Sequence, residues 1–335
     1  MTSADRFPLA DWIDDHEGCR FNLGSSGMRG AVPPPPWPRR RVSREIARTL
    51  RAELADHLDI DPGRLFLAHG ASEANAWVLG WLARYRCSGT RVARARVRYP
   101  EYPPLFDGAR ALGFVVHGDG RPVDVAVTSR PRNPGGELWT EETLSDFAEG
   151  ARALVVDETF REFAEVPSVA ARGMAGVWAT GSFTKYFGAD EVRVGYAVTP
   201  PAEAASFGRY VGLVSDEIAP ASAAAALGLL RTIGRVRKAV RAVLAPNLAA
   251  FARAFPGAKL PAAPLHFDWL TRTTGRSFAR RCLGASVLVC PGEYFGEPRG
   301  VRLCLTRRAT PAALRAYRRV RDRWVGPPSA ESTGV

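Results

Sequence analysis

The fold is decided by the stretch GVWATGSFTKYFGADEVRVGY, residues 176–196. Its first part, 176–181, is an apolar run that predicts a β-strand. Ser182 and Lys185 directly follow this run, and Arg193 lies further along the same stretch. At the carboxyl end of a strand in an α/β sheet, side chains point into the ligand-binding crevice. A lysine amine there can form a Schiff base with a carbonyl, and a hydroxyl and a guanidinium beside it can bind a phosphate.

Lysine is scarce in this basic chain. The formal net charge is +12 from 46 lysines and arginines, but the lysines are only Lys185, Lys238 and Lys259. A basic balance is compatible with a nucleic-acid partner or with acidic small molecules, whereas an excess of arginine over lysine is typical of GC-rich coding. Any lysine chemistry therefore has three candidates.

Strands and helices alternate on both sides of the deciding stretch. Strands are predicted at 65–68, 91–99, 113–117, 123–128, 153–157, 176–181 and 193–198. Helices are predicted at 42–58, 72–84 and 140–147, and they dominate again from 202 to 255. This alternation predicts an α/β fold in which helices cover both faces of a mostly parallel sheet.

The last third of the chain has a different pattern. Short strands are predicted at 265–270, 286–290 and 301–305, and a helix begins at Thr310-Pro311, with Leu314, Tyr317, Val320 and Trp324 as its apolar stripe. A length of 335 residues allows two domains. We expect an N-terminal arm at 1–35 that belongs to a small domain, a large domain at 36–225, the rest of the small domain at 226–325, and a tail at 326–335.

Composition excludes several classes of protein. The five cysteines are odd in number, scattered and without a CxxC pair, so we expect reduced thiols in a cytoplasmic protein and neither disulfides nor a metal site. No apolar run is long enough to predict a membrane span. The first residues lack the pattern of a signal peptide.

Six motifs together resemble the class I/II aminotransferases, the fold-type-I enzymes that use pyridoxal 5'-phosphate (PLP). The motifs are Gly70-Ala71-Ser72-Glu73-Ala74, Pro100-Glu101-Tyr102, Asn133-Pro134-Gly135-Gly136, Asp157-Glu158-Thr159-Phe160, Ser182-x-x-Lys185 with Arg193-Val194-Gly195-Tyr196, and Pro291-Gly292 with Arg302. They follow one another in the family's order and cover about residues 20–320. The resemblance implies a large domain with a seven-stranded sheet, a small α+β domain and a homodimer.

The resemblance also implies a role for each matched residue. Lys185 would hold PLP and act as general base and acid, with Asp157 paired to the ring nitrogen. A buried carboxylate at a strand end needs such a partner. The remaining implied contacts are the PLP phosphate with Ala71, Ser72, Ser182 and Arg193, the ring face with Tyr102, the phenolic oxygen with Asn133, and the substrate carboxylate with Arg302.

Three positions depart from the family pattern. Phe160 replaces the tyrosine that hydrogen-bonds the PLP phenolic oxygen, and with Thr184 it resembles threonine-phosphate decarboxylases and histidinol-phosphate aminotransferases. Residues 39–41 are arginines in the region where those relatives carry a tyrosine for the neighbouring subunit's phosphate. Residues 22–27 resemble the family's substrate-covering loop only loosely.

The leading hypothesis is a transaminase that moves an amino group between an amino acid, or a phosphorylated amine such as histidinol phosphate, and a 2-oxo acid. The second hypothesis, which Phe160 favours, is a decarboxylase of the threonine-phosphate type. A third is a basic nucleic-acid-binding protein with the fold of a PLP enzyme but without its activity. The complete set of PLP-site residues disfavours this hypothesis. We therefore expect small-molecule substrates, and neither nucleic acid nor membrane as a partner.

Overall fold

A seven-stranded sheet forms the centre of the computed structural model, which describes residues 7–87, 92–118 and 121–326. The strands are β2 (Leu65–Ala68), β3 (Arg94–Arg96), β4 (Val115–His117), β5 (Val125–Ser129), β6 (Ala153–Asp157), β7 (Val177–Ser182) and β8 (Gly195–Val198). Their order is β2-β8-β7-β6-β5-β3-β4, and all neighbours are parallel except β8, which is antiparallel to β2 and β7. The predicted mostly parallel sheet is confirmed.

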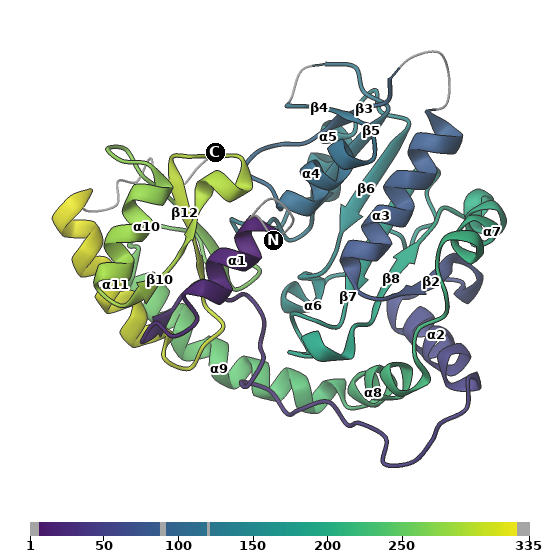
Figure 1. Ribbon diagram of the computed structural model, residues 1–335, viewed down its shortest axis with the longest axis horizontal. Coiled ribbons are helices and arrows are strands. Elements are labelled where there is room, and N and C mark those ends of the chain that lie inside the picture. The colour runs from purple at the N-terminus through teal and green to yellow at the C-terminus, as the bar shows by residue number, and fades with distance from the viewer. Residues whose placement is uncertain (1–6, 88–91, 119–120, 327–335) are drawn as a thin grey trace.

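Helices cover both faces of this sheet (Figure 1). They are α2 (Glu45–Leu58), α3 (Ala71–Trp81), α4 (Pro103–Ala111), α5 (Glu141–Phe147), α6 (Arg161–Ala164), α7 (Ala204–Val214) and α8 (Pro220–Arg231). Successive side chains of a strand point to opposite faces. Val155 of β6 thus packs in the cluster of α3 and α4, whereas Leu154 and Val156 pack against α5. Burial on both faces explains why these strands read as continuous apolar runs.

A second unit combines the two ends of the described chain. Its antiparallel sheet has the order β11 (Cys290–Pro291), β12 (Gly300–Cys304) and β9 (Leu265–Trp269). From the N-terminal arm, β1 (Phe21–Asn22) pairs in parallel with β10 (Val287–Leu288). The helices of this unit are α1 (Pro8–Asp15), α10 (Gly275–Gly284) and α11 (Thr310–Trp324). The long helix α9 (Ile233–Ala254) runs along the bottom of Figure 1 between the two units.

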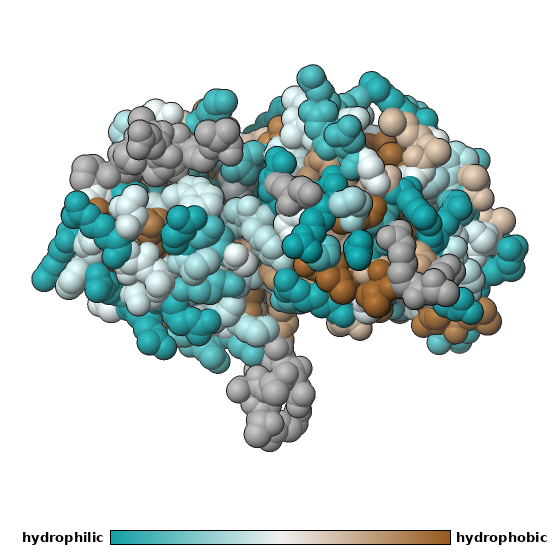
Figure 2. All heavy atoms as spheres, turned by 90° about the horizontal axis from the view of Figure 1, so that it is seen from above, coloured by the Kyte–Doolittle hydropathy of each residue, from teal (hydrophilic) through white to brown (hydrophobic). Residues whose placement is uncertain are grey.

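The surface differs between the two units. Figure 2 shows hydrophilic side chains over most of the left half, which holds the second unit, whereas in the right half, which holds the seven-stranded sheet, patches of hydrophobic side chains lie among the hydrophilic ones. Leu213 and Val214 at the end of α7 are 84% and 51% exposed. In the described part of the chain, no helix is long and apolar enough to cross a membrane.

Some expected boundaries moved. The strand predicted at 91–99 is only Arg94–Arg96, and residues 88–91 lie outside the described ranges. Trp324, which was predicted in the apolar stripe of α11, is 45% exposed and does not lie in the core. The guanidinium carbon of Arg281 lies 4.0 Å from the centre of its ring. The domain boundary expected at 225/226 falls within α8 and stays a prediction, and the expected tail beyond Gly326 lies outside the described residues.

Candidate active site

One edge of the large sheet collects the ends of several strands. The register pairs Ser129 at the end of β5 with Asp157 at the end of β6, and Asp157 with Thr180 of β7. Ser182 at the end of β7 lies opposite Gly195, the first residue of the antiparallel β8. Chain segments that leave these strands must therefore begin side by side, at the position where open α/β sheets bind ligands.

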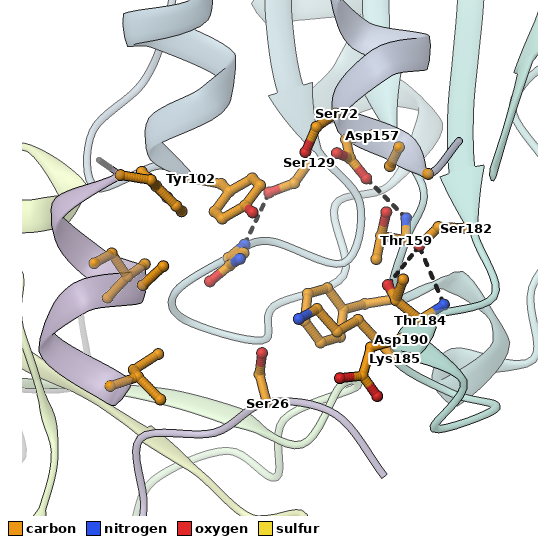
Figure 3. Close-up of a pocket in the computed structure, with 18 of the residues that line it drawn as sticks. Ser26, Ser72, Tyr102, Ser129, Asp157, Thr159, Ser182, Thr184, Lys185 and Asp190 are labelled. Atoms are coloured by element: carbon orange, nitrogen blue, oxygen red, sulfur yellow. Dashed lines mark hydrogen bonds between the residues drawn. The ribbon is translucent and has the colours of Figure 1, made fainter. Parts of the chain in front are cut away.

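All the residues that the sequence predicted for the site line one pocket at this edge (Figure 3). They are Ala71, Ser72, Tyr102, Asn133, Asp157, Ser182, Lys185, Arg193 and Arg302. Lys185 lies centrally in the view, with Asp157 and Ser182 on one side of it and Tyr102 across the cavity. Side chains from both units meet here, because Arg302 belongs to β12 of the second unit.

The Asp157 carboxylate is held by groups from two directions. The side chain is 4% exposed; its Oδ2 accepts a hydrogen bond from Asn75 Nδ2 at 2.9 Å, and its Oδ1 accepts one from the Thr159 amide at 2.9 Å. Thr180 Oγ1 in turn donates to Asn75 Oδ1 at 2.7 Å. Asn75 was not predicted from the sequence, although a polar residue on the otherwise apolar inner face of α3 is the signal that could have found it.

A cradle for an anion lies at the start of α3. The first amides of a helix lack acceptors within it, so they can bind a phosphate. Gly70 precedes α3 with φ +103°, and a Cβ on it would lie 2.9 Å from Arg193 Nη2. Arg193 Nη2 donates to the His69 carbonyl at 3.0 Å. A Cβ on Gly195 would lie 2.4 Å from the carbonyl carbon of Gly70, so both glycines are required for this close approach.

Lys185 follows β7 in a segment that hydrogen bonds fix at Lys185 and at the residues before it. Its carbonyl accepts a hydrogen bond from the Met28 amide of the N-terminal arm at 2.9 Å. The hydroxyls of Ser182 and Thr184, which precede it, are 2.7 Å apart. Burial lowers the pKa of the Lys185 amine, and the positive charges of Arg302 and Arg193 act in the same direction. A lowered pKa increases the neutral, nucleophilic fraction of the amine near neutral pH.

Tyr102 and Asn133 are positioned by one buried carboxylate. Glu101 is fully buried, and its Oε1 accepts hydrogen bonds from the Tyr102 amide at 2.8 Å and from Ser129 Oγ at 2.6 Å. Ser129 Oγ also accepts from the Asn133 amide at 2.8 Å. Arg132 Nη1 neutralises Glu101 at 2.7 Å. The sequence analysis placed Glu101 in a motif without a role of its own and did not identify Ser129, since nothing local distinguishes a buried glutamate from a solvated one.

Burial raises the pKa of the Tyr102 phenol to about 12, and the Asp157 charge adds to this rise. The phenol therefore stays neutral at physiological pH, and the ring is free to pack as an aromatic face.

Arg302 is buried at the other end of the pocket. The side chain is 2% exposed; its Nη1 donates to Asn133 Oδ1 at 3.2 Å, and its Nη2 donates to the Gly24 carbonyl at 2.9 Å. The guanidinium carbon lies 4.8 Å from the centre of the Phe295 ring. Within the described residues its Nε has no partner, so the guanidinium retains a donor for a ligand.

Phe160 lines the pocket at the position where the family pattern has tyrosine. It packs against Phe163 with the ring centres 6.0 Å apart, and it supplies no donor. The neighbouring Thr159 Oγ1 is buried and finds no partner among the described residues. Additional lining residues that the sequence did not predict as site residues are Phe7, Leu9, Ala10, Ile13, Ser26, Gly70, Ser129, Thr159, Thr184 and Asp190.

These groups fit PLP. A buried carboxylate suits the ring nitrogen, the glycine-lined cradle with Arg193 suits the phosphate, and the Lys185 amine suits the aldehyde. The unpartnered Thr159 Oγ1 and Arg302 Nε are polar atoms of the kind that a ligand satisfies.

Comparisons with known proteins agree with this geometry. Residues 117–316, more than half of the chain, match the family model of aminotransferase class I and II. A histidinol-phosphate aminotransferase of Haloferax volcanii is 37% identical over 29% of this chain and 28% of its own. An aromatic amino acid aminotransferase of Mycobacteroides abscessus is 27% identical over 76% of this chain and 78% of its own.

Solved structures share the fold. A PLP-dependent aminotransferase from Streptococcus suis superposes with a TM-score of 0.75 at 18% identity and covers 96% of this chain and 99% of its own. In the sequence comparison, this chain matches only about 28% of the length of the first curated relatives, the histidinol-phosphate aminotransferases of Archaeoglobus fulgidus and Haloferax volcanii. The structure from Streptococcus suis is that of a PLP-dependent enzyme. The family match, with which the site geometry agrees, establishes that the chain belongs to the class I and II aminotransferases.

Proposed function

We propose that this protein is a PLP-dependent aminotransferase that exchanges an amino group between an amino acid and a 2-oxo acid. One observation carries the proposal: a lysine amine of lowered pKa lies in a pocket with a buried carboxylate, and with an arginine at each end. The family membership and the aminotransferase names of the relatives support it.

The proposed work of Lys185 is proton transfer. PLP, when bound, withdraws electrons from the α-carbon of the substrate. The Lys185 Nζ then takes the α-proton and returns a proton one position away, for which its neutral amine must be available. The lowered pKa supports this role.

The proposed work of the other residues is binding and orientation. The Asp157 carboxylate holds the ring nitrogen, and its two hydrogen bonds from Asn75 and Thr159 keep it from rotating. Ala71, Ser72, Ser182 and Arg193 bind the phosphate. Tyr102 covers the ring, and Asn133 donates to the phenolic oxygen while its Oδ1 orients Arg302. Arg302 binds the substrate carboxylate.

We also propose a homodimer. Ser72 and Arg193 of the phosphate cradle are exposed in the single chain, which supports completion of the site by a second copy. The exposed Leu213 and Val214 are apolar surface that an interface would cover. The three arginines at 39–41 are candidates for the contact with the neighbouring phosphate. Five free cysteines, four of them buried, support the cytoplasmic location.

A decarboxylase remains the second candidate because Phe160 leaves the phenolic oxygen without the usual tyrosine donor. Which bond at the α-carbon breaks depends on which bond stands perpendicular to the ring. Carbon dioxide release without amine transfer is the readout that separates the two functions.

The test is the absorbance spectrum of the purified protein with PLP, recorded before and after addition of a panel of L-amino acids. We expect a yellow band that one or more amino acids bleach and that 2-oxoglutarate or another 2-oxo acid restores. Lys185→Ala is the control that should lack the band. Bleaching that is accompanied by carbon dioxide and is not restored by any 2-oxo acid would favour the decarboxylase, and no yellow band in the wild type would contradict both functions.

A further inference from the structure

The helix α1 forms an uncharged wall of the pocket. Phe7, Leu9, Ala10 and Ile13 line it, and Figure 3 shows α1 along one side of the cavity, opposite the end where Asp157 lies. Leu9, Ala10 and Ile13 share one face of the helix by their three- and four-residue spacing. This wall is absent from the family motifs, which lie further along the chain.

Specific contacts hold α1 in place. The indole N–H of Trp12 donates to the Val289 carbonyl at 2.8 Å. Leu9 is 3% exposed and packs with Phe295, the ring on which the Arg302 guanidinium lies. The Phe7 ring meets the Tyr102 ring edge to face, with centres 6.2 Å apart. The wall therefore continues directly from the substrate arginine.

Each cationic side chain that lines the pocket in the described chain already has a hydrogen-bond partner or a proposed role. Arg193 lies against the start of α3 through its bond to His69, Arg302 is anchored beside Asn133, and Lys185 is the reactive amine. Asp190 adds a negative charge to the lining, and its Oδ1 is buried and unpartnered within the described residues. A cation close by, Arg29, is paired with Asp190 Oδ2 at 3.3 Å.

We propose that the substrate is an α-amino acid with an uncharged, apolar side chain, which packs against Phe7 and against Leu9, Ala10 and Ile13 of α1. The inference rests on the proposed function. A carboxylate bound at Arg302 leaves the substrate side chain to meet this wall, where a second anionic group would lose its hydration and, among the described residues of the chain, would face no further lining cation. Apolar contact is what such a wall recognises.

L-Leucine and L-aspartate form a matched pair for the test, because both branch at the γ-position and differ mainly in charge. The rate at which each bleaches the yellow band of the holoenzyme is measured in single-turnover experiments over a range of concentrations. We expect the apparent second-order rate constant to be at least about 100-fold larger for L-leucine. An equal or larger constant for L-aspartate would overturn the inference and leave the proposed function standing.

A charge introduced on α1 tests the location of the side chain. Ala10→Arg should raise the L-aspartate to L-leucine ratio by at least about 10-fold relative to Ala10→Gln, which adds a long neutral side chain at the same place. Yellow absorbance of both variants verifies that they bind PLP. An Ala10→Arg ratio equal to that of Ala10→Gln would mean that α1 does not face the substrate side chain and would overturn the inference. Absence of bleaching with every amino acid would instead contradict the proposed function itself.

Discussion

The two ends of the pocket are built by different means. The cofactor end, formed by Gly70, Asn75, Asp157 and Arg193, is assembled from segments at one edge of one sheet, with polar groups held by hydrogen bonds and backbones in close contact. The substrate end, formed by Arg302 and α1, is assembled from the second unit and the N-terminal arm, and most of its wall is apolar. We therefore expect the reaction chemistry to depend on the cofactor end, and the proposed selectivity to depend on segments that come from elsewhere in the chain.

The largest expected effect is at the amine that lies between the two ends. Lys185→Ala should abolish the yellow band and lower turnover by about 10⁴-fold or more, because both the covalent attachment of PLP and the proton transfer are lost. Spectra and steady-state rates measure these changes. Arg302→Lys is the matching substitution at the substrate end, and it should retain the yellow band and raise KM. Loss of the band in Arg302→Lys would show that the substrate end also contributes to PLP binding and would contradict the separation of the two ends.

Glycine-to-alanine substitutions test whether the backbone is packed more tightly at the cofactor end than at the substrate end. Gly195→Ala should destabilise the protein by roughly 3 kcal/mol or more, because its Cβ would meet the backbone of Gly70 at 2.4 Å, and backbone cannot move aside. Gly24→Ala at the substrate end should cost less, about 1–2 kcal/mol, since its Cβ would meet the buried Leu288 side chain at 2.9 Å and not the backbone. Denaturant unfolding of the two variants gives both values.

The control is Gly212→Ala, for which the Cβ would meet nothing within 4 Å on the helix α7. It should be neutral or stabilise by about 0.5–1 kcal/mol, as alanine does in an exposed helix position. A cost at Gly24 equal to that at Gly195 would contradict the view that the substrate end is the softer one.

Asn75 tests the hydrogen-bond network of the cofactor end. Asn75→Ala should cost about 1–3 kcal/mol of unfolding free energy, because Thr180 Oγ1 and Asp157 Oδ2 would each lose a buried partner. PLP affinity should fall together with stability. Ala76→Ser on the exposed face of the same helix is the control and should change stability by less than about 0.5 kcal/mol. An unchanged PLP affinity in Asn75→Ala would show that Asp157 needs no support from α3.

The pH dependence of the apoprotein tests the environment of Lys185. Because burial lowers the pKa of this amine in the folded state, its protonated form disfavours folding. The penalty is complete below the folded-state pKa and disappears as pH rises toward the usual lysine value of about 10.4. Lys185→Met should therefore be more stable than wild type at neutral pH, with a difference that shrinks at alkaline pH. Urea titrations without PLP at several pH values check this, and a pH-independent difference would be contrary evidence.

Tyr102 should show the smallest effect. Tyr102→Phe keeps the ring that faces both ends of the pocket, and the phenol, with a pKa of about 12, does not titrate in the assay range. We expect a change in kcat/KM below about 3-fold and an unaltered pH profile, whereas Tyr102→Ala should lose about 10-fold or more with the aromatic contact. A large loss in Tyr102→Phe would mean that the hydroxyl contacts the substrate or the cofactor.

The sheet, the family and most of the residues proposed for the cofactor end could be predicted from the sequence. The strands are readable because burial on both faces requires apolar residues at successive positions, which gives short continuous apolar runs. The motifs around Gly70, Asp157 and Lys185 are readable because each chemical task requires a fixed residue type at a fixed spacing along a short segment. Their convergence follows from the register of a parallel sheet, which brings the carboxyl ends of β5, β6 and β7 to one edge.

Tertiary structure alone decided the supports and the substrate wall. Asn75 donates to Asp157, 82 residues further along the chain, and Ser129 donates to Glu101, 28 residues before it, so the sequence does not show these partners. The wall of α1 and Arg302 line one pocket although almost 300 residues separate them in the chain, because β1 pairs with β10 and Trp12 donates to the Val289 carbonyl. Contacts between distant segments are set by packing of the whole chain, and for that reason only the tertiary structure reveals the wall on which the proposed selectivity rests.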